Sequence, residues 1–334
     1  MAGGDRHLEP GPADRAAVQR LLRLLSSIGA ALMLVVIVSS AFLRLEQAGL
    51  SCADWPACYG RIDPDAAATT GALLARFAHR VAASAVGIAL LAALLIGATQ
   101  RPWLKPQVAI AAAALAIALG LAALGAGFPT SVAEIASPPV VLANLGGGFA
   151  LFALLWLLRL TTLPPPLAPM PSWLALVATL ALLAEIVQIT LGTLVSAKFA
   201  ALACPAFPAC GSDWPAGSLL ETLNPFAERV LGPGGAIARP AALAGLHWLH
   251  RLGALFVLAL GATLALPLLR VGAQARRLGA ILAVLLVAQP ALGAALVLAE
   301  LPLALAVAHN AGAALLLATL VTAVHALHAS APPS

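Results

Sequence analysis

The stretch LLSSIGAALMLVVIVSSAFL, residues 24–43, runs for twenty residues without a charged side chain. As a helix it would rise about 30 Å, the thickness of the hydrocarbon core of a bilayer. Seven further apolar runs follow, at 73–97, 107–126, 139–159, 172–195, 243–268, 279–298 and 303–327. The chain of 334 residues is 62% hydrophobic and 9% charged, which excludes a soluble domain of this size. The sequence therefore predicts an all-α polytopic membrane protein with eight transmembrane helices.

Basic and acidic residues divide the connecting segments into two sets. Lys and Arg cluster before the first run, between the second and third, after the fourth, and between the sixth and seventh, whereas most acidic residues lie in the other segments. Because positively charged loops stay in the cytoplasm, we predict that both termini are cytoplasmic, in a bacterial-type plasma (inner) membrane. The net charge of +5 is thus a topology signal and indicates no nucleic-acid partner.

Two cysteine-containing segments lie on the predicted outer side. They are AGLSCADWPACYG at 48–60 and AALACPAFPACGSDWP at 200–215, each with five residues between its cysteines. In an oxidising compartment such closely spaced pairs tend to form disulfides. The alternative is a metal site, which would need four thiolates or added histidines, and neither segment contains His. We therefore expect the disulfides Cys52–Cys58 and Cys204–Cys210.

The two halves of the chain are similar in sequence. RFAHRVAASAVG at 76–87 matches HWLHRLGALFVL at 247–258, and VVLANLGGGFALFALL at 140–155 matches LALAVAHNAGAALLLATL at 303–320. Each copy contains four membrane crossings, which gives both copies the same orientation. The repeat predicts two tandem four-helix bundles.

This repeat also sets the expected domain boundaries. The two bundles are expected at 24–160 and 172–328, with a cytoplasmic linker between them at 161–171. A mobile cytoplasmic arm is expected at 1–23, because that segment is polar and contains several arginines, and a short tail at 329–334.

Three histidines stand out among those within the apolar runs, where ionisable side chains are costly and usually functional. His79, His250 and His309 are each about 10 Å into a run that is entered from the outer side. Two imidazoles on facing helices can bind a haem iron axially, and His250 and His309 would form such a pair. The alternative is that each is a hydrogen-bonding core residue. Arg80 and Arg251 would hold haem propionates or anchor the interface.

Two other polar residues in the runs carry weaker predictions. His247 lies one helical turn before His250, on the same face, and is expected to support that residue or to replace it as a ligand. Glu185 is deep in the fifth run, where we expect it to be protonated or paired with Gln188. A role in proton transfer is the alternative for this carboxyl group.

Four features of the sequence occur together: GLSCADWPACYG, the second cysteine loop, the two four-helix repeats, and the His-Arg pairs that open the second and sixth runs. In these features the chain resembles the haem A synthase family over residues 24–328. This family oxidises a methyl group of haem O to a formyl group through successive hydroxylations, which gives haem A. The resemblance implies a haem-dependent oxidoreductase with haem b between His250 and His309. It also implies that haem O binds in the first bundle, where His79 would be the catalytic, iron-binding residue.

The same resemblance implies a set of partners. Haem A would be delivered to terminal oxidases, and haem O would come from a farnesyltransferase. An electron donor is needed for the oxidation, and an oligomer is compatible with the family.

The first half departs from the family pattern at two positions. The family has a second histidine where this chain has Asn144, and a glutamate three residues before His79 where this chain has Arg76. Asn is a poor iron ligand, and Arg cannot act as a carboxylate base. Two alternatives to haem A synthesis therefore stay open. One is a catalytically reduced relative that binds haem for transport, insertion or sensing, and the other is a membrane electron-transfer cytochrome b.

Overall fold

The computed structural model describes residues 12–48, 54–56, 58–60, 69–100, 104–127, 138–164, 167–204, 206–208, 210, 219–227 and 241–330. Its helices are α1 (Pro12–Gln47), α2 (Thr70–Thr99), α3 (Lys105–Gly127), α5 (Pro138–Leu160), α6 (Ser172–Ala197), α7 (Leu219–Leu223), α8 (Ala241–Leu269), α9 (Ala273–Leu298) and α10 (Leu303–Ala329). All except the short α7 are long and apolar enough to cross a bilayer. No strand occurs in the described ranges. The predicted fold class, an all-α multi-pass membrane protein, is therefore confirmed.

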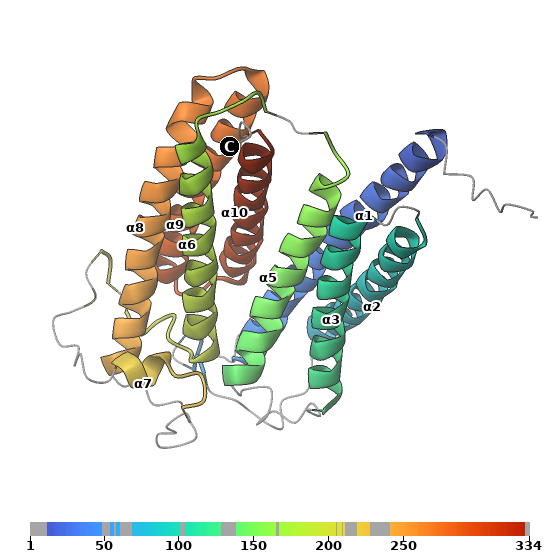
Figure 1. Ribbon diagram of the computed structural model, residues 1–334. Coiled ribbons are helices and arrows are strands. Elements are labelled where there is room, and N and C mark those ends of the chain that lie inside the picture. Colours follow the sequence, from blue (N-terminus) through green and yellow to red (C-terminus); the bar gives the residue numbers. More distant parts are fainter. Residues whose placement is uncertain are drawn as a thin grey trace, which may run out of the picture.

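The long helices pack in two sets of four, which lie side by side in Figure 1. In the first set α1 contacts α2 and α5, and α3 contacts the same two helices. In the second set α6 contacts α8 and α10, and α9 contacts the same two helices. Helices α8 and α10, which carry His250 and His309, thus occupy diagonal positions. The arrangement is consistent with the two predicted tandem bundles.

Helices α5 and α10 join the two sets. Helix α10 packs against α1 and α5, and α5 packs against α6. Leu317 of α10 belongs to the same buried apolar cluster as Phe152 of α5. Trp156 Nε1 of α5 donates a hydrogen bond to Thr322 Oγ1 of α10 at 2.8 Å. Since lipid tails are as apolar as these side chains, close packing and such hydrogen bonds stabilise the contact between the sets.

Helix α1 is longer than the first apolar run. Residues 12–23, expected as part of a mobile arm, belong to this helix. Leu22 is fully buried against α2, α3 and α5, and Arg23 Nη2 donates to Thr162 O at 2.6 Å. Packing on these neighbours extends the helix beyond the apolar run. The helix also continues past residue 43, where the predicted run ends, so that Arg44 lies inside it.

The first cysteine loop reaches across to the second set of helices. Trp55 Nε1 donates to Glu300 O at 3.2 Å. The Tyr59 ring lies edge-on to the Phe199 ring, with centroids 5.6 Å apart, and both belong to a buried cluster with Leu301. The turns after α6 and α9 thus hold a loop that follows α1.

Candidate functional site

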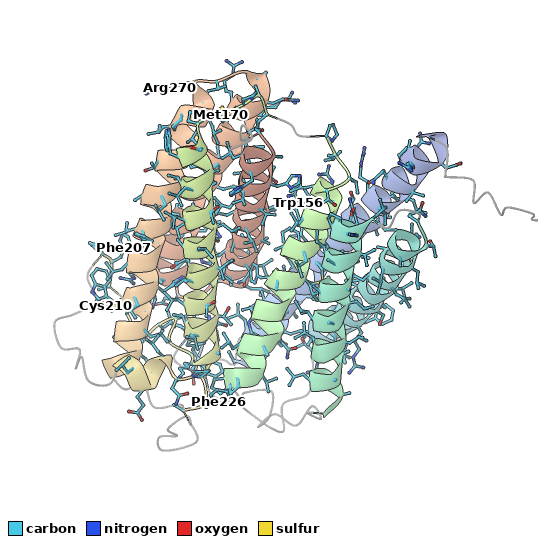
Figure 2. All side chains as sticks on the ribbon, in the orientation of Figure 1. Trp156, Met170, Phe207, Cys210, Phe226 and Arg270 are labelled. Atoms are coloured by element: carbon cyan, nitrogen blue, oxygen red, sulfur yellow. A yellow bond between two sulfur atoms is a disulfide. The ribbon has the colours of Figure 1, made fainter. Side chains whose placement is uncertain are left out.

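A cavity of about 390 Å³ lies within the second set of helices. Side chains of α6, α8, α9 and α10 line it, together with residues of α1, α5 and the first cysteine loop. Figure 2 shows Phe207, one of the lining residues, beside α8 and close to Cys210. The wall is mostly apolar with a few polar side chains, which is typical of a ligand pocket.

Two histidine side chains face each other at this cavity. His250 of α8 and His309 of α10 both line it, and their ring centroids are 6.5 Å apart, with ring planes at 77°. An imidazole nitrogen binds a metal ion at about 2 Å, so two rings on opposite sides of one ion have centroids about 6 Å apart. The observed separation of 6.5 Å would allow both rings to bind one metal ion. The structure thus brings together the two histidines that the sequence paired.

Each of these histidines has a glutamine beside it. Gln188 Nε2 of α6 lies 3.1 Å from His250 Nδ1 and donates to His250 O at 2.9 Å. Gln289 Nε2 of α9 donates to His309 O at 3.1 Å. The two amides tie α8 to α6 and α10 to α9 at the turns that carry the rings. Gln188 therefore contacts the His250 ring as well as its backbone, whereas Gln289 holds only the backbone of His309.

The site also contains buried polar atoms without a hydrogen-bond partner. Four such side-chain atoms occur among the described residues, and three of them are here: Gln188 Oε1, Gln289 Oε1 and His309 Nδ1. Buried polar groups are nearly always paired, either within the protein or with a bound group. Their concentration around the histidine pair indicates a site built for a ligand that brings metal or polar atoms.

Two glycines leave room for the histidine rings. A Cβ atom added at Gly192 of α6 would lie 2.9 Å from His250 Cε1, and one added at Gly293 of α9 would lie 3.3 Å from His309 Cε1. Both distances are shorter than the separation at which carbon atoms attract each other. The ring separation, the unpartnered atoms and the glycines together fit a metal centre with two histidine ligands, such as a haem iron.

The sequence model for the COX15-CtaA family, described as cytochrome oxidase assembly protein, matches residues 23–321. The chain belongs to this family. It is also 34% identical over 308 residues to the heme A synthase of Shewanella oneidensis, in an alignment that covers 86% of this chain and 91% of the relative. The histidine pair and both cysteine loops lie inside the region that the family model matches.

In this member of the COX15-CtaA family Arg251 holds the second cysteine loop. Its guanidinium donates to Cys204 O at 2.7 Å, to Ala206 O at 2.8 Å and to Pro208 O at 3.0 Å. The predicted disulfide Cys204–Cys210 is present in this loop. Arg251 also borders the cavity, and its role toward a propionate stays a prediction.

The first half contributes one histidine from within its helices. His79 of α2 lies with Nδ1 3.4 Å from Ser39 Oγ of α1. Arg76 is half-buried and Arg80 is exposed, and neither forms a hydrogen bond with another described residue. In the first cysteine loop, Cys58 is disulfide-bonded, whereas Cys52, its predicted partner, lies outside the described residues.

Asn144 of α5, at the position that the sequence repeat aligns with His309, is exposed. It lies three residues before Gly147, where an added Cβ would lie 2.8 Å from the side chain of Leu121 in α3. In the second half the histidine of α10 lies three residues before Gly312, where an added Cβ would lie 2.8 Å from Gln289 Oε1. At these corresponding positions the first half has Asn144 and Leu121, where the second half has the imidazole of His309 and the amide of Gln289.

Two further ionisable side chains border the cavity. His247 is buried, and its Nδ1 lies 3.1 Å from Ala200 O, so its ring is tied to the turn after α6. Glu185 is 2% exposed and has no hydrogen-bond or ion-pair partner among the described residues. The expected pairing of Glu185 with Gln188 is not present, because the Gln188 amide nitrogen is engaged with α8.

The sequence analysis does not predict several polar residues of the cavity, among them Gln289, Asn310 and Arg44. Polar side chains within membrane-spanning helices are rare, and they usually face the interior of a bundle. A search for every such residue at the depth of the histidines would have found Gln289 and Asn310. Arg44 escapes because the apolar run ends one residue before it, whereas the helix continues.

Proposed function

We propose that this protein is a haem A synthase, an oxidoreductase that converts haem O to haem A by oxidising a methyl group of the porphyrin to a formyl group. The observation that carries the proposal is the pair of His250 and His309, with ring centroids 6.5 Å apart at a buried cavity. The relative that is 34% identical is named heme A synthase, and the family comprises cytochrome oxidase assembly proteins. Haem A would supply such oxidases.

The second bundle, 172–328, holds haem b in this proposal. His250 and His309 would supply the two iron ligands, and Gln188 and Gln289 would hold the helical turns that carry them through hydrogen bonds to the backbone carbonyls of His250 and His309. A haem with two imidazole ligands supplies a one-electron redox centre. The apolar side chains around it limit the access of water, which influences the redox potential.

The first bundle, 24–160, receives haem O in the same proposal. His79 is the one histidine of this segment and offers an imidazole to the substrate iron. Ser39 lies beside its Nδ1 and orients the ring. Arg80, one residue further along α2, is exposed and can bind a propionate near the outer surface. With Asn144 in place of a second histidine, the iron would keep an open coordination position.

We place the protein in the bacterial-type plasma (inner) membrane with both termini in the cytoplasm. The cysteine loops then face the oxidising side, in agreement with the disulfide Cys204–Cys210. The partners are a farnesyltransferase that makes haem O and an electron donor, and an oligomer is compatible with this arrangement.

The first half also supports a second candidate function. Asn144 and Arg76 stand where the family pattern has a histidine and a glutamate, and Leu121 lies beside Gly147 as Gln289 lies beside Gly312 in the second half. The chain would then be a catalytically reduced relative that binds haem for transport, insertion or sensing. The histidine pair of the second half, taken alone, would also suit a membrane electron-transfer cytochrome b.

Haem extraction separates these candidates. The unmodified protein, His79→Ala and His250→Ala are produced in a host that makes haem O, and the extracted haems are separated by chromatography. We expect haem A or hydroxylated haem O from the unmodified protein only. Low-spin haem without product would favour the reduced relative, whereas rapid oxidation of a quinol without product would indicate a cytochrome. Product that persists in His79→Ala would refute the placing of the substrate.

A further inference from the structure

Arg44 extends from α1 into the cavity of the second bundle. Its Nε donates to Ser196 Oγ at 3.3 Å, its Nη1 to Ser40 Oγ at 2.9 Å and its Nη2 to Asn310 Oδ1 at 3.3 Å. Ser196 belongs to the last turn of α6, and Asn310 follows His309 on α10. The guanidinium therefore lies where α1, α6 and α10 meet, beside a residue that is next to one of the two paired histidines.

The partners of this cation are all neutral. They are two hydroxyl groups and one amide, and no acidic side chain among the described residues forms an ion pair with Arg44. Glu46, two residues away, instead accepts a hydrogen bond from Thr69 Oγ1 at 2.6 Å. Charged side chains within membrane-spanning helices usually pair with an opposite charge or serve a ligand. The contacts of Arg44 leave that negative charge to be supplied by the contents of the cavity.

The second arginine at the cavity is less free to bind a ligand. Arg251 makes its hydrogen bonds to three backbone carbonyls of a disulfide-closed loop. The acceptors of Arg44 are side chains, which can rotate to admit another acceptor. A planar guanidinium also matches a carboxylate group through two parallel hydrogen bonds.

The composition of the cavity wall indicates the class of ligand. Apolar side chains form most of the wall, the histidine pair lies within it, and Arg44 adds a positive charge from the first half of the chain. A ligand that fits has a large apolar body, a metal-binding centre and an acidic substituent at its edge. A metalloporphyrin with carboxylate side chains has all three.

We propose that Arg44, positioned by Ser196 and Asn310, binds a carboxylate of the ligand in this cavity. Under the proposed function, on which the identity of the ligand rests, this carboxylate is a propionate of haem b. The two halves then share one binding site, because a helix of the first bundle supplies the cation for a group that the second bundle ligates.

The test compares haem with its dimethyl ester, in which both propionates are esterified and uncharged. The full-length chain, produced without haem supply and purified in detergent, is titrated with each compound, and the low-spin absorption band reports binding. We expect the unmodified protein to bind haem at least about tenfold more tightly than the ester, the effect of one charged hydrogen-bonded pair. Arg44→Gln should lower haem affinity by about the same factor and leave ester affinity unchanged. Arg270→Gln, which removes an exposed arginine at the other end of the molecule, is the matched control and should retain the preference.

Each outcome of this titration decides the proposal. Equal affinities for haem and ester in the unmodified protein would overturn it, and so would a preference that survives in Arg44→Gln. If Arg44→Gln does not fold, Ser196→Ala and Asn310→Ala keep the charge but release it from its position, and an unchanged preference in both would overturn the proposal. Failure of the unmodified protein to form low-spin haem would refute the haem site itself. Loss of the preference alone, with binding that still depends on His250 and His309, would refute only the role of Arg44.

Discussion

Alanine at Gly192 tests the histidine site through shape alone. The added Cβ would lie 2.9 Å from His250 Cε1, whereas carbon atoms make favourable contacts at about 3.5–4.0 Å. The ring or helix α6 must therefore move by roughly 0.6–1.1 Å. Overpacking of this kind costs about 1–3 kcal/mol. If this free energy is lost from haem binding because the His250 ring is displaced, haem affinity should drop by a factor of roughly 5–150.

Two other glycines provide a graded series and a control. At Gly293 the added Cβ would lie 3.3 Å from His309 Cε1, so a smaller loss is expected there. At Gly87 in α2 the added Cβ would meet nothing within 4 Å, although the chemical change is the same. Each alanine variant is purified in detergent, and haem per protein and the low-spin band are measured. The expected order of haem loss is Gly192→Ala, then Gly293→Ala, with Gly87→Ala equal to the unmodified protein.

Two results would contradict this reasoning. Full haem content and an unchanged spectrum in Gly192→Ala would mean that the His250 ring is not confined by α6, or is not a ligand. Equal losses in Gly192→Ala and Gly87→Ala would show that alanine disturbs helix packing in general, because only the first site has a ring within reach.

The remaining predictions concern the first half and the loops. Asn144→His together with Leu121→Gln should give the first bundle a second imidazole and an amide beside it. Haem bound there should then change from high-spin to low-spin, which electron paramagnetic resonance measures. No change would mean that α2 and α5 do not face each other as α8 and α10 do. Arg251→Gln removes three hydrogen bonds to the second cysteine loop, so thermolysin should cleave that loop about tenfold or more faster, and an unchanged rate would show that the loop is held by other contacts. Alkylation without reduction should leave Cys204 and Cys210 unmodified in mass spectrometry, and labelling of either would argue against their disulfide.

The helices and the pairing of His250 with His309 were accessible from the sequence. A run of about 20 apolar residues crosses a bilayer as a helix, because a helix satisfies its backbone hydrogen bonds internally where lipid offers no partner. The two histidines occur at similar depths in the second copy of the internal repeat. Helices that correspond in the two copies are expected to take equivalent positions in their bundles. Depth in the membrane and internal repetition can both be read from the sequence. The approach of the two rings could therefore be predicted without knowing how the helices pack.

Contacts between the two sets of helices were not accessible in this way. Arg44 lies beyond the apolar run, and its approach to Asn310 depends on how α1 packs against α10. Trp55 reaches Glu300 because two loops far apart in sequence meet outside the helices. Arg251 is adjacent to a histidine, but the path of the loop decides that its donors meet backbone carbonyls. Each of these outcomes is a matter of tertiary geometry that neither hydropathy nor spacing records.

The packing site of the first cysteine loop is formed by segments that are synthesised at different times, so the loop cannot pack completely until the last of them is made. Trp55 and Tyr59 leave the ribosome early, whereas Leu301, against which the loop packs, is made just before the final helix. At about 5–20 residues per second, α10 follows α1 by roughly 10–50 s. Throughout that interval the loop can pack against Phe199, which follows α6, but not against Leu301, and the cavity lacks the wall that α10 supplies. Loading of a prosthetic group therefore has to wait for the last helix to insert, and a chain that stalls before α10 carries a partly uncovered aromatic surface by which quality-control proteases can distinguish it from the finished protein.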